Sequence, residues 1–362
     1  MINGHGGNIY ELATELGCEP VDIYDMSSNV NPIGPPPGLT DFLRDRLDEI
    51  TALPEVDART AVESFARRWD IDPRRVLAAN GTTQFIYTLP QALKPLKTLI
   101  FGPTYADYAD ACVMYHVPHA FVQATDATDF NHDLKAAAPA IDTADLVFIC
   151  NPNNPTGTLI ESPKLKALCE SFPNTCFAID ESYLPFAPDR ARYTMIHCGL
   201  ANVVVLNSMS KIFRLPGLRI GFLIGSPDII RNIESFALPW SANSLAQAAV
   251  RFLMEHRGET DAFIDRSREL IAAERGKFVD SLAGTTGIHF FPSVTSFVLG
   301  RLADGLTSDV VWKQMARQRL LIRNCANFPG LSNRYIRISM KTPEINRMAA
   351  ERLVQVLGGE QD

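Results

Sequence analysis

Residues 206–221 read LNSMSKIFRLPGLRIG, and this stretch places one amine, Lys211, just after an apolar run. Two hydroxyl groups, Ser208 and Ser210, stand on its N-terminal side, and the guanidinium of Arg219 follows on its C-terminal side. A solvated loop with incidental charges would have the same composition. Whether these polar groups form a site therefore depends on what the rest of the sequence places near them.

Four other short apolar runs also end in a cluster of small or polar residues. They are RVLAAN (75–80) before GTTQ, TLIF (98–101) before GPTY, DLVFIC (145–150) before NPNNPTG, and TCFAI (175–179) before DES. Helix-like segments such as SPKLKALCESF (162–172) lie between the runs. Apolar strands that alternate with helices predict a mainly parallel α/β sheet with right-handed crossovers. Because the carboxyl ends of parallel strands share one edge, we expect the polar clusters to line one crevice.

The character of the sequence changes after about residue 228. A helix, a Pro-Trp interruption, a second helix and a long amphipathic helix around 259–283 are predicted, followed by two short strands, HFFPSVTSFVLGRL and RYIRISM. We predict a large domain at 41–245 and a smaller α+β domain at 246–362. The turn-rich first forty residues, 1–40, are expected to form a strap that docks on the small domain.

Bulk composition excludes several classes of function. The 362 residues carry a net charge of −7, which argues against a nucleic-acid partner or an anionic membrane surface. No secretory leader and no apolar stretch of membrane-spanning length is evident. The seven cysteines are scattered without a C-x-x-C pair. We therefore expect reduced thiols, no metal site and a cytoplasmic protein.

The polar clusters together fit an anionic, aromatic aldehyde cofactor. Lys211 can form a Schiff base with an aldehyde, and Asp180, at a strand end, can pair with a pyridinium nitrogen. Tyr105 can stack on the ring, and Asn154 and Tyr183 can donate hydrogen bonds to a phenolate oxygen. Each residue also has a plainer alternative, such as a helix cap for Asp180, a core position for Tyr105 and an ordinary turn for NPNNPTG.

A second group of residues is suited to hold a phosphate. GTT (81–83) opens a predicted helix, whose first backbone N–H groups can bind an anion. Neighbouring hydroxyl and guanidinium groups would complete a cup. The predicted phosphate-binding residues are Gly81, Thr82, Thr83, Ser208, Ser210 and Arg219.

The motifs NPNNPTG, AIDESY, SMSKIFRLPGLRIGF and YIRIS resemble those of the fold-type I pyridoxal-phosphate enzymes. They are most similar to the class I/II aminotransferases near histidinol-phosphate aminotransferase. This resemblance implies a pyridoxal 5'-phosphate cofactor, a large domain with a mainly parallel seven-stranded sheet, and a homodimer. It also implies that Lys211 is the Schiff-base lysine, Asp180 the pyridinium partner, Asn154 and Tyr183 the phenolate donors, and Arg337 the arginine for the substrate carboxylate.

Two segments, HGGNIYELATELG…DMSSNVNPIGPP (5–36) and LLIRNCANFPGLSNRYIRISM (320–340), resemble the threonine-phosphate decarboxylases of cobalamin biosynthesis. Their substrate, L-threonine O-3-phosphate, is a small phosphorylated amino acid. Arginine matches both of its anionic groups. We expect Arg337 to bind the carboxylate and Arg323 the phosphate. The residues expected to contact the substrate are His5, Gly6, Gly7, Asn29, Asn154, Arg323 and Arg337.

Several alternatives stay open at the level of sequence. Histidinol-phosphate amino transfer uses the same cofactor and two arginines, phosphoserine differs from phosphothreonine by one methyl group, and a binding protein without turnover is a further possibility. The chain departs from the family pattern in two places: Ser296 replaces an asparagine that is common in relatives, and LPEVDA (53–58) stands where relatives commonly carry YPDxxY. Leu53 cannot make the contact that the first tyrosine makes with the cofactor phosphate of the neighbouring subunit.

Overall fold

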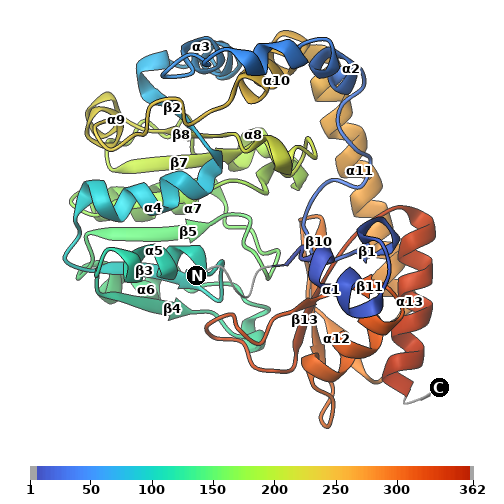
Figure 1. The fold of residues 1–362 in the computed structure, drawn as a ribbon. Coiled ribbons are helices and arrows are strands. Elements are labelled where there is room, and N and C mark those ends of the chain that lie inside the picture. The colour runs from blue at the N-terminus through green and yellow to red at the C-terminus, as the bar shows by residue number, and fades with distance from the viewer. Residues whose placement is uncertain (1–5, 359–362) are drawn as a thin grey trace.

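The computed structural model describes residues 6–358 of the chain. A seven-stranded sheet with its helices makes up the larger part of the molecule, and a four-stranded sheet with three helices makes up the smaller part (Figure 1). In order across the large sheet, the strands are β2 (Val76–Ala79), β8 (Gly221–Ile224), β7 (Val203–Ser208), β6 (Cys176–Asp180), β5 (Leu146–Cys150), β3 (Thr98–Gly102) and β4 (His119–Gln123). β8 runs antiparallel to β2 and β7, and the other six strands all run in one direction.

The five apolar runs identified in the sequence correspond to β2, β3, β5, β6 and β7, so the prediction of a mainly parallel sheet is confirmed. The strands β4 and β8 are additional to the predicted ones. The edge strand β4 is only half buried, and its five residues, HAFVQ, begin and end with a polar side chain. β8 is buried along its whole length but short, and it follows the Lys211 stretch without an intervening α-helix. The prediction rests on buried apolar runs that alternate with helices: β4 therefore lacks the buried run, and β8 lacks the α-helix before it.

Helices follow β2, β3, β4 and β5 and carry the chain back to the start of the next parallel strand. These crossover helices are α4 (Gly81–Leu93), α5 (Asp107–Met114), α6 (Leu134–Ile141) and α7 (Ser162–Ser171). The predicted helix, Pro-Trp interruption and helix are confirmed as α9 (Pro227–Glu234) and α10 (Ser244–Glu255). The remaining helices of the large part are α2 (Leu39–Arg44), α3 (Arg59–Trp69) and the short α8 (Arg190–Tyr193). Its 3₁₀ turns are Leu47–Thr51, Pro73–Arg75, Asp126–Thr128, Leu184–Phe186 and Pro216–Leu218, and a further 3₁₀ turn, Pro20–Asp22, lies in the N-terminal strap.

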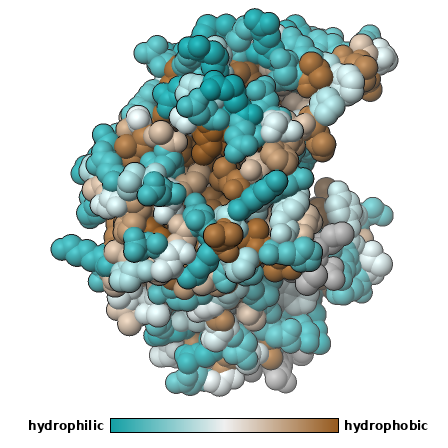
Figure 2. Space-filling model, turned by 90° about the vertical axis from the view of Figure 1, so that its left-hand side faces the viewer, coloured by the Kyte–Doolittle hydropathy of each residue, from teal (hydrophilic) through white to brown (hydrophobic). Residues whose placement is uncertain are grey.

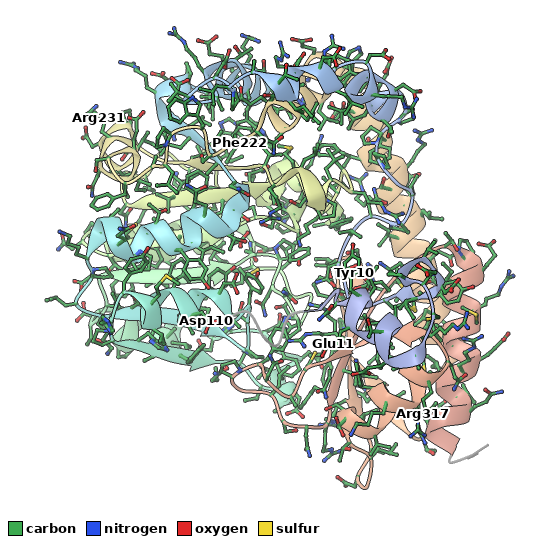
Figure 3. The ribbon with its side chains drawn as sticks, in the orientation of Figure 1. Tyr10, Glu11, Asp110, Phe222, Arg231 and Arg317 are labelled. Atoms are coloured by element: carbon green, nitrogen blue, oxygen red, sulfur yellow. The ribbon has the colours of Figure 1, made fainter. Side chains whose placement is uncertain are left out.

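Apolar packing fixes the large sheet against its helices. Phe222 of β8 points into the interior (Figure 3), where its ring stacks on Phe65 of α3 with 4.1 Å between the ring centroids. Both side chains are fully buried, and burying a large apolar side chain contributes about 1.5–3 kcal/mol to folding. The strand ends that carry polar residues are held at fixed positions by this core.

The smaller part contains an antiparallel sheet in the order β12 (Arg323–Asn324), β13 (Tyr335–Ser339), β10 (Phe297–Leu302) and β9 (Ile288–Phe290). Its helices are α11 (Arg257–Ser281), α12 (Ser308–Arg317) and α13 (Pro343–Gly358). The prediction of a single strand over HFFPSVTSFVLGRL was wrong, because the segment forms β9 and β10 with a turn between them. Pro292, between the two strands, has no N–H to donate to a neighbouring strand. The Thr295 N–H donates to the Ser293 hydroxyl and so is not used for strand pairing.

The described part of the predicted strap contacts the smaller sheet and its helices. Its strand β1 (Tyr24–Asp25) pairs in parallel with β11 (Leu320–Leu321), and the adjacent Met26 is fully buried in the core of the smaller part. Helix α1 (Ile9–Leu16) packs its Leu12 against the same region. The first residues of α11 also pack into the core of the large part, so the boundary at residue 245 stays a prediction.

Each of the seven cysteines is a free thiol. Within residues 6–358, no helix is both long enough and apolar enough to cross a membrane.

Candidate active site

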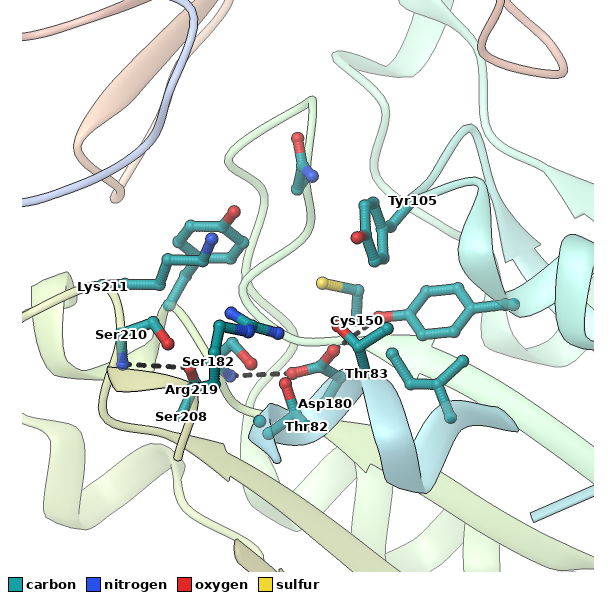
Figure 4. Close-up of a pocket in the computed structure, with 15 residues that line it drawn as sticks. Thr82, Thr83, Tyr105, Cys150, Asp180, Ser182, Ser208, Ser210, Lys211 and Arg219 are labelled. Atoms are coloured by element: carbon teal, nitrogen blue, oxygen red, sulfur yellow. Dashed lines mark hydrogen bonds between the residues drawn. The ribbon is translucent and has the colours of Figure 1, made fainter. Parts of the chain in front are cut away.

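One pocket opens at the carboxyl edge of the large sheet (Figure 4), and its empty space, including the part open to solvent, is about 510 Å³. All the residues predicted to hold a cofactor line it, although they come from five separate stretches of the chain. These residues are Gly81, Thr82, Thr83, Tyr105, Asn154, Asp180, Tyr183, Ser208, Ser210, Lys211 and Arg219.

Asp180 ends β6 at the floor of the pocket and is 5% exposed. Its Oδ1 accepts a hydrogen bond from the Ser182 N–H at 2.9 Å, and its Oδ2 accepts one from the Tyr108 hydroxyl at 2.8 Å. No α-helix begins at this point, since the chain continues into a 3₁₀ turn at Leu184–Phe186. Asp180 is therefore a fixed buried carboxylate and does not cap an α-helix.

Lys211 enters the pocket from the segment that follows β7. Its Nζ lies 5.9 Å from the ring centroid of Tyr183. The Ser208 hydroxyl accepts a hydrogen bond from the Ser210 N–H at 3.2 Å, which fixes the turn just before the lysine. The Asn31 N–H donates to the Lys211 carbonyl at 3.0 Å, so the N-terminal strap also contacts this turn.

Two glycines make room for an anion cradle at the start of α4. Gly81 has a φ of +75°, and a Cβ at this position would lie 2.7 Å from an Nη of Arg219. A Cβ on Gly221 would lie 2.5 Å from the Thr82 nitrogen. The guanidinium can thus lie directly over the N-terminus of α4, beside the hydroxyls of Thr82 and Ser208. A helix N-terminus with a guanidinium and hydroxyl groups around it is suited to a phosphate.

A hydrogen-bond chain joins the pocket to the strap and to β13. The Asn29 side chain donates to the Tyr183 hydroxyl at 3.1 Å and accepts from the Ser339 hydroxyl at 2.6 Å. The Arg337 guanidinium donates to the Asn154 side-chain oxygen and to the Ser27 carbonyl. Asn154 therefore uses its oxygen toward the arginine, which leaves its amide NH₂ to donate.

The two predicted substrate arginines lie directly opposite each other on β12 and β13. Arg337 is 4% exposed, and its Nε has no hydrogen-bond partner among the described residues. Arg323 lies over the ring of Phe328 and donates to the Asn327 side chain at 2.7 Å. Burial lowers the pKa of Arg323 to about 10, and the charge of Arg337 acts in the same direction.

The predicted substrate residues at the N-terminus are placed less directly. His5 lies outside the described residues. Gly6 and Gly7 pack against Ser27, farther along the same strap: the Gly7 N–H donates to the Ser27 hydroxyl at 2.7 Å, and a Cβ at Gly6 would lie 2.8 Å from the Ser27 carbonyl oxygen. The structure thus brings these glycines to the residue that binds Arg337. Neither glycine lines the pocket itself, and Arg323 and Arg337 lie beyond its lining residues.

Some lining residues were missed by sequence reasoning. Tyr108, Cys150, Ser182 and Ile86 all face the pocket. Tyr108 stands three residues after Tyr105 in PTYADY, but nothing in that spacing indicates that its hydroxyl reaches Asp180. Cys150 could have been found as the last residue of its apolar run.

The class I and II aminotransferase family model matches residues 25–353, and the chain belongs to this family. It is 32% identical to the threonine-phosphate decarboxylase of Salmonella typhimurium, over 99% of this chain and 97% of that protein. It is 29% identical to the adenosylcobalamin biosynthesis bifunctional protein CobDQ of Leptospira interrogans, covering 98% of this chain but only 41% of that protein. This chain is thus much shorter than the bifunctional relative.

Solved structures agree with the family assignment. The L-threonine-O-3-phosphate decarboxylase of Porphyromonas gingivalis superposes with a TM-score of 0.81 at 30% identity, covering 92% of this chain and 99% of that one. Histidinol-phosphate aminotransferases are also similar in sequence, among them that of Moorella thermoacetica, which is 28% identical over 97% of this chain and 89% of that protein. The predicted fold class, the fold-type I α/β architecture, is confirmed.

A second buried carboxyl group, Glu181, lies next to Asp180 but points away from the pocket. It is 1% exposed, and it accepts hydrogen bonds from the Thr194 hydroxyl at 2.7 Å and from the Met195 N–H. Burial raises the pKa of Glu181 from 4.5 to about 8, and the charge of Asp180 adds to this effect. These hydrogen bonds hold the end of β6 against the segment that follows α8.

We predict that Glu181→Gln makes the stability of the protein less dependent on pH. Between its ordinary pKa of 4.5 and about 8, the folded chain keeps a proton on Glu181 that the unfolded chain has lost. The free energy of unfolding therefore falls as pH rises through this window, by up to about 1.4 kcal/mol per pH unit. Urea unfolding between pH 5 and 9 measures the slope.

The amide that replaces the Glu181 carboxyl in this variant keeps an oxygen for the Met195 N–H, so the variant should be the more stable protein at alkaline pH. Glu170→Gln, which changes an exposed glutamate of α7, is the matched control and should keep the wild-type slope. Identical slopes in the Glu181→Gln variant and the wild type would contradict the account.

Proposed function

We propose that this chain is a pyridoxal-phosphate-dependent decarboxylase that converts L-threonine O-3-phosphate to (R)-1-amino-2-propanol O-2-phosphate, a step of cobalamin biosynthesis. The names of the relatives at 32% and 30% identity support this proposal. The observation that carries it within the structure is the pair formed by Arg323 and Arg337.

Like charges directly opposite each other on neighbouring strands destabilise a sheet. Arg323 and Arg337 occupy such positions, and Arg337 is almost fully buried. A ligand with two anionic groups would offset this repulsion. Phosphothreonine carries a carboxylate and a phosphate, and a guanidinium binds either group through two parallel hydrogen bonds.

The residues of the pocket fit pyridoxal phosphate. The cradle that Gly81 leaves open to Arg219 would hold the phosphate group, together with the nearby hydroxyls. Asp180 would pair with the ring nitrogen, Tyr105 would cover a face of the ring, and Lys211 would bond to the aldehyde carbon. When bound, this cofactor supplies an electron-accepting ring that makes loss of carbon dioxide from an amino acid feasible.

The other residues would bind and orient the groups that react. Tyr183 and the NH₂ of Asn154 would donate to the ring oxygen, and Asn29 fixes the Tyr183 hydroxyl through its 3.1 Å hydrogen bond. Arg337, fixed by Ser27 and Asn154, would set the direction of the substrate carboxylate. Arg323 would bind the substrate phosphate.

Decarboxylation requires the bond from the α-carbon to the carboxylate to stand perpendicular to the ring, whereas amino transfer requires the α-carbon–hydrogen bond there. Two neighbouring anion sites, at Arg323 and Arg337, would select the first orientation. The amino group of the substrate would take the place of Lys211 at the aldehyde carbon, so the amine of Lys211 would be free to hold a proton and, once carbon dioxide has left, to deliver it to the α-carbon. No keto-acid co-substrate is then needed, which distinguishes this function from histidinol-phosphate amino transfer.

We further propose a cytoplasmic homodimer. Leu53, Val56, Leu238 and Trp240 are all at least about half exposed in the single chain, and the Trp240 N–H donates to the Val56 carbonyl, so the two segments adjoin. Figure 2 shows hydrophobic side chains among hydrophilic ones on the face that carries α9. Sedimentation should give twice the mass of the chain, and a stable monomer at micromolar concentration would contradict the dimer.

Lys211→Ala should abolish the visible absorption of the bound cofactor, because no other described lysine lines the pocket. In the wild type, borohydride reduction followed by peptide mapping should label Lys211. The exposed Lys164→Ala of α7 is the control and should keep the absorption. A label on a different lysine would refute the assignment.

Arg337→Ala and Arg323→Ala should each lower kcat/KM for phosphothreonine by about ten-fold or more, because a charge-assisted hydrogen bond is lost. The two effects should differ in kind. Loss of the carboxylate contact in Arg337→Ala misaligns the scissile bond and lowers kcat, whereas loss of the phosphate contact in Arg323→Ala mainly raises KM. Release of carbon dioxide from carboxyl-labelled phosphothreonine measures both.

Arg317→Ala, at the exposed end of α12 (Figure 3), is the matched control and should leave both constants unchanged. Phosphoserine and histidinol phosphate with 2-oxoglutarate are assayed alongside phosphothreonine. Efficient amino transfer from histidinol phosphate without carbon dioxide release from phosphothreonine would overturn the proposed function.

A further inference from the structure

Tyr108 of α5 is fully buried at the back of the active-site pocket, and its hydroxyl donates a hydrogen bond to Oδ2 of Asp180 at 2.8 Å. The other oxygen of Asp180, Oδ1, accepts from the Ser182 N–H at 2.9 Å. Each carboxylate oxygen thus has a fixed donor. Because an ionised carboxylate has about four acceptor positions, Asp180 can still accept a further hydrogen bond from a ligand.

The position of the Tyr108 hydroxyl is fixed by packing of its ring. The ring stacks on Phe148 of β5 with 5.0 Å between the centroids and an interplanar angle of 16°. The ring of Tyr105 meets it edge-on at 5.9 Å. Since β5 and β6 are neighbouring strands, Phe148 and Asp180 are parts of the same rigid sheet. The hydroxyl therefore cannot leave the carboxylate without disturbing the core.

The same surroundings keep Tyr108 protonated. Burial raises the pKa of Tyr108 well above its ordinary value, and the charge of Asp180 acts in the same direction. The residue is thus a hydrogen-bond donor throughout the neutral and mildly alkaline range. A donor to a carboxylate stabilises its ionised form. A purely space-filling side chain would need no hydroxyl here, and a phenylalanine would fill nearly the same volume.

We infer that Tyr108 is a positioning residue that acts through Asp180: its hydroxyl stabilises the ionised carboxylate and holds it oriented toward the ring nitrogen of the bound cofactor. This inference rests on the cofactor part of the proposed function and is independent of the substrate. It assigns a role in cofactor recognition to a residue outside the motifs on which the family resemblance is based.

Binding of the cofactor to the apoenzyme tests this role without any measurement of turnover. The protein is titrated with pyridoxal phosphate and with its carbocyclic analogue, in which C–H replaces the ring nitrogen. The wild type should prefer pyridoxal phosphate. Tyr108→Phe should reduce that preference by about ten-fold, since it removes a hydrogen bond to a charged group, and should leave affinity for the analogue nearly unchanged. Thermal unfolding of each variant verifies that it is folded.

Tyr115→Phe is the matched control, because it removes a hydroxyl at the end of the same helix that bonds to Gln91 and not to Asp180. It should keep the wild-type preference. In an Asp180→Asn background, Tyr108→Phe should have no further effect on the preference. Equal loss of affinity for both ligands in Tyr108→Phe, or an additive effect in the double variant, would overturn the inference.

The failure of this inference is distinguishable from that of the proposed function. If the wild-type apoenzyme does not bind pyridoxal phosphate, the proposed cofactor is wrong. If it binds the cofactor with a preference that Tyr108→Phe leaves intact, only the role of Tyr108 is wrong.

Discussion

The buried carboxylate of Asp180 is the group around which the site is built. A carboxylate that is 5% exposed is costly to ionise unless donors surround it, and here a tyrosine hydroxyl and a backbone N–H each bind one of its oxygens. These donors come from α5 and from the turn after β6, so the carboxylate depends on the packing of neighbouring strands. Its position at the end of a central strand brings it close to the polar residues that end β2, β5 and β7, because these strands run parallel in one sheet.

Arg337 links the two parts of the molecule through its hydrogen bonds. One guanidinium, carried by the small sheet, donates to the Ser27 carbonyl of the strap and to the Asn154 side chain in the loop after β5. The strap itself pairs with β11 and covers the small core through Met26. The contact between the two sheets thus depends on the same guanidinium that we propose for the substrate carboxylate. A ligand bound to Arg337 would therefore contact a side chain that belongs to the small sheet and is hydrogen-bonded to the strap and to the large part.

Much of this organisation could be predicted from the sequence. The β-rich apolar runs that end in polar clusters have a period and a length that identify parallel strands, and the strand ends then place Lys211, Asp180 and the glycine-led helix in one pocket. The strands β4 and β8 could not be predicted in this way, because one is half buried at an edge and the other runs antiparallel without a following helix of the crossover type. Tyr108 could not be assigned a function either, since its partner is 72 residues away in the chain and only the packing of α5 on β5 and β6 brings them together.

The fate of the substrate nitrogen tests the central claim most directly. Phosphothreonine labelled with ¹⁵N is incubated with the holoenzyme in the presence of 2-oxoglutarate, and the products are identified by mass spectrometry. The account predicts that all of the label stays in 1-amino-2-propanol O-2-phosphate and that no labelled glutamate forms, because carbon dioxide leaves and the nitrogen is retained. Transfer of the label to glutamate, with the carboxylate of phosphothreonine intact, would contradict it.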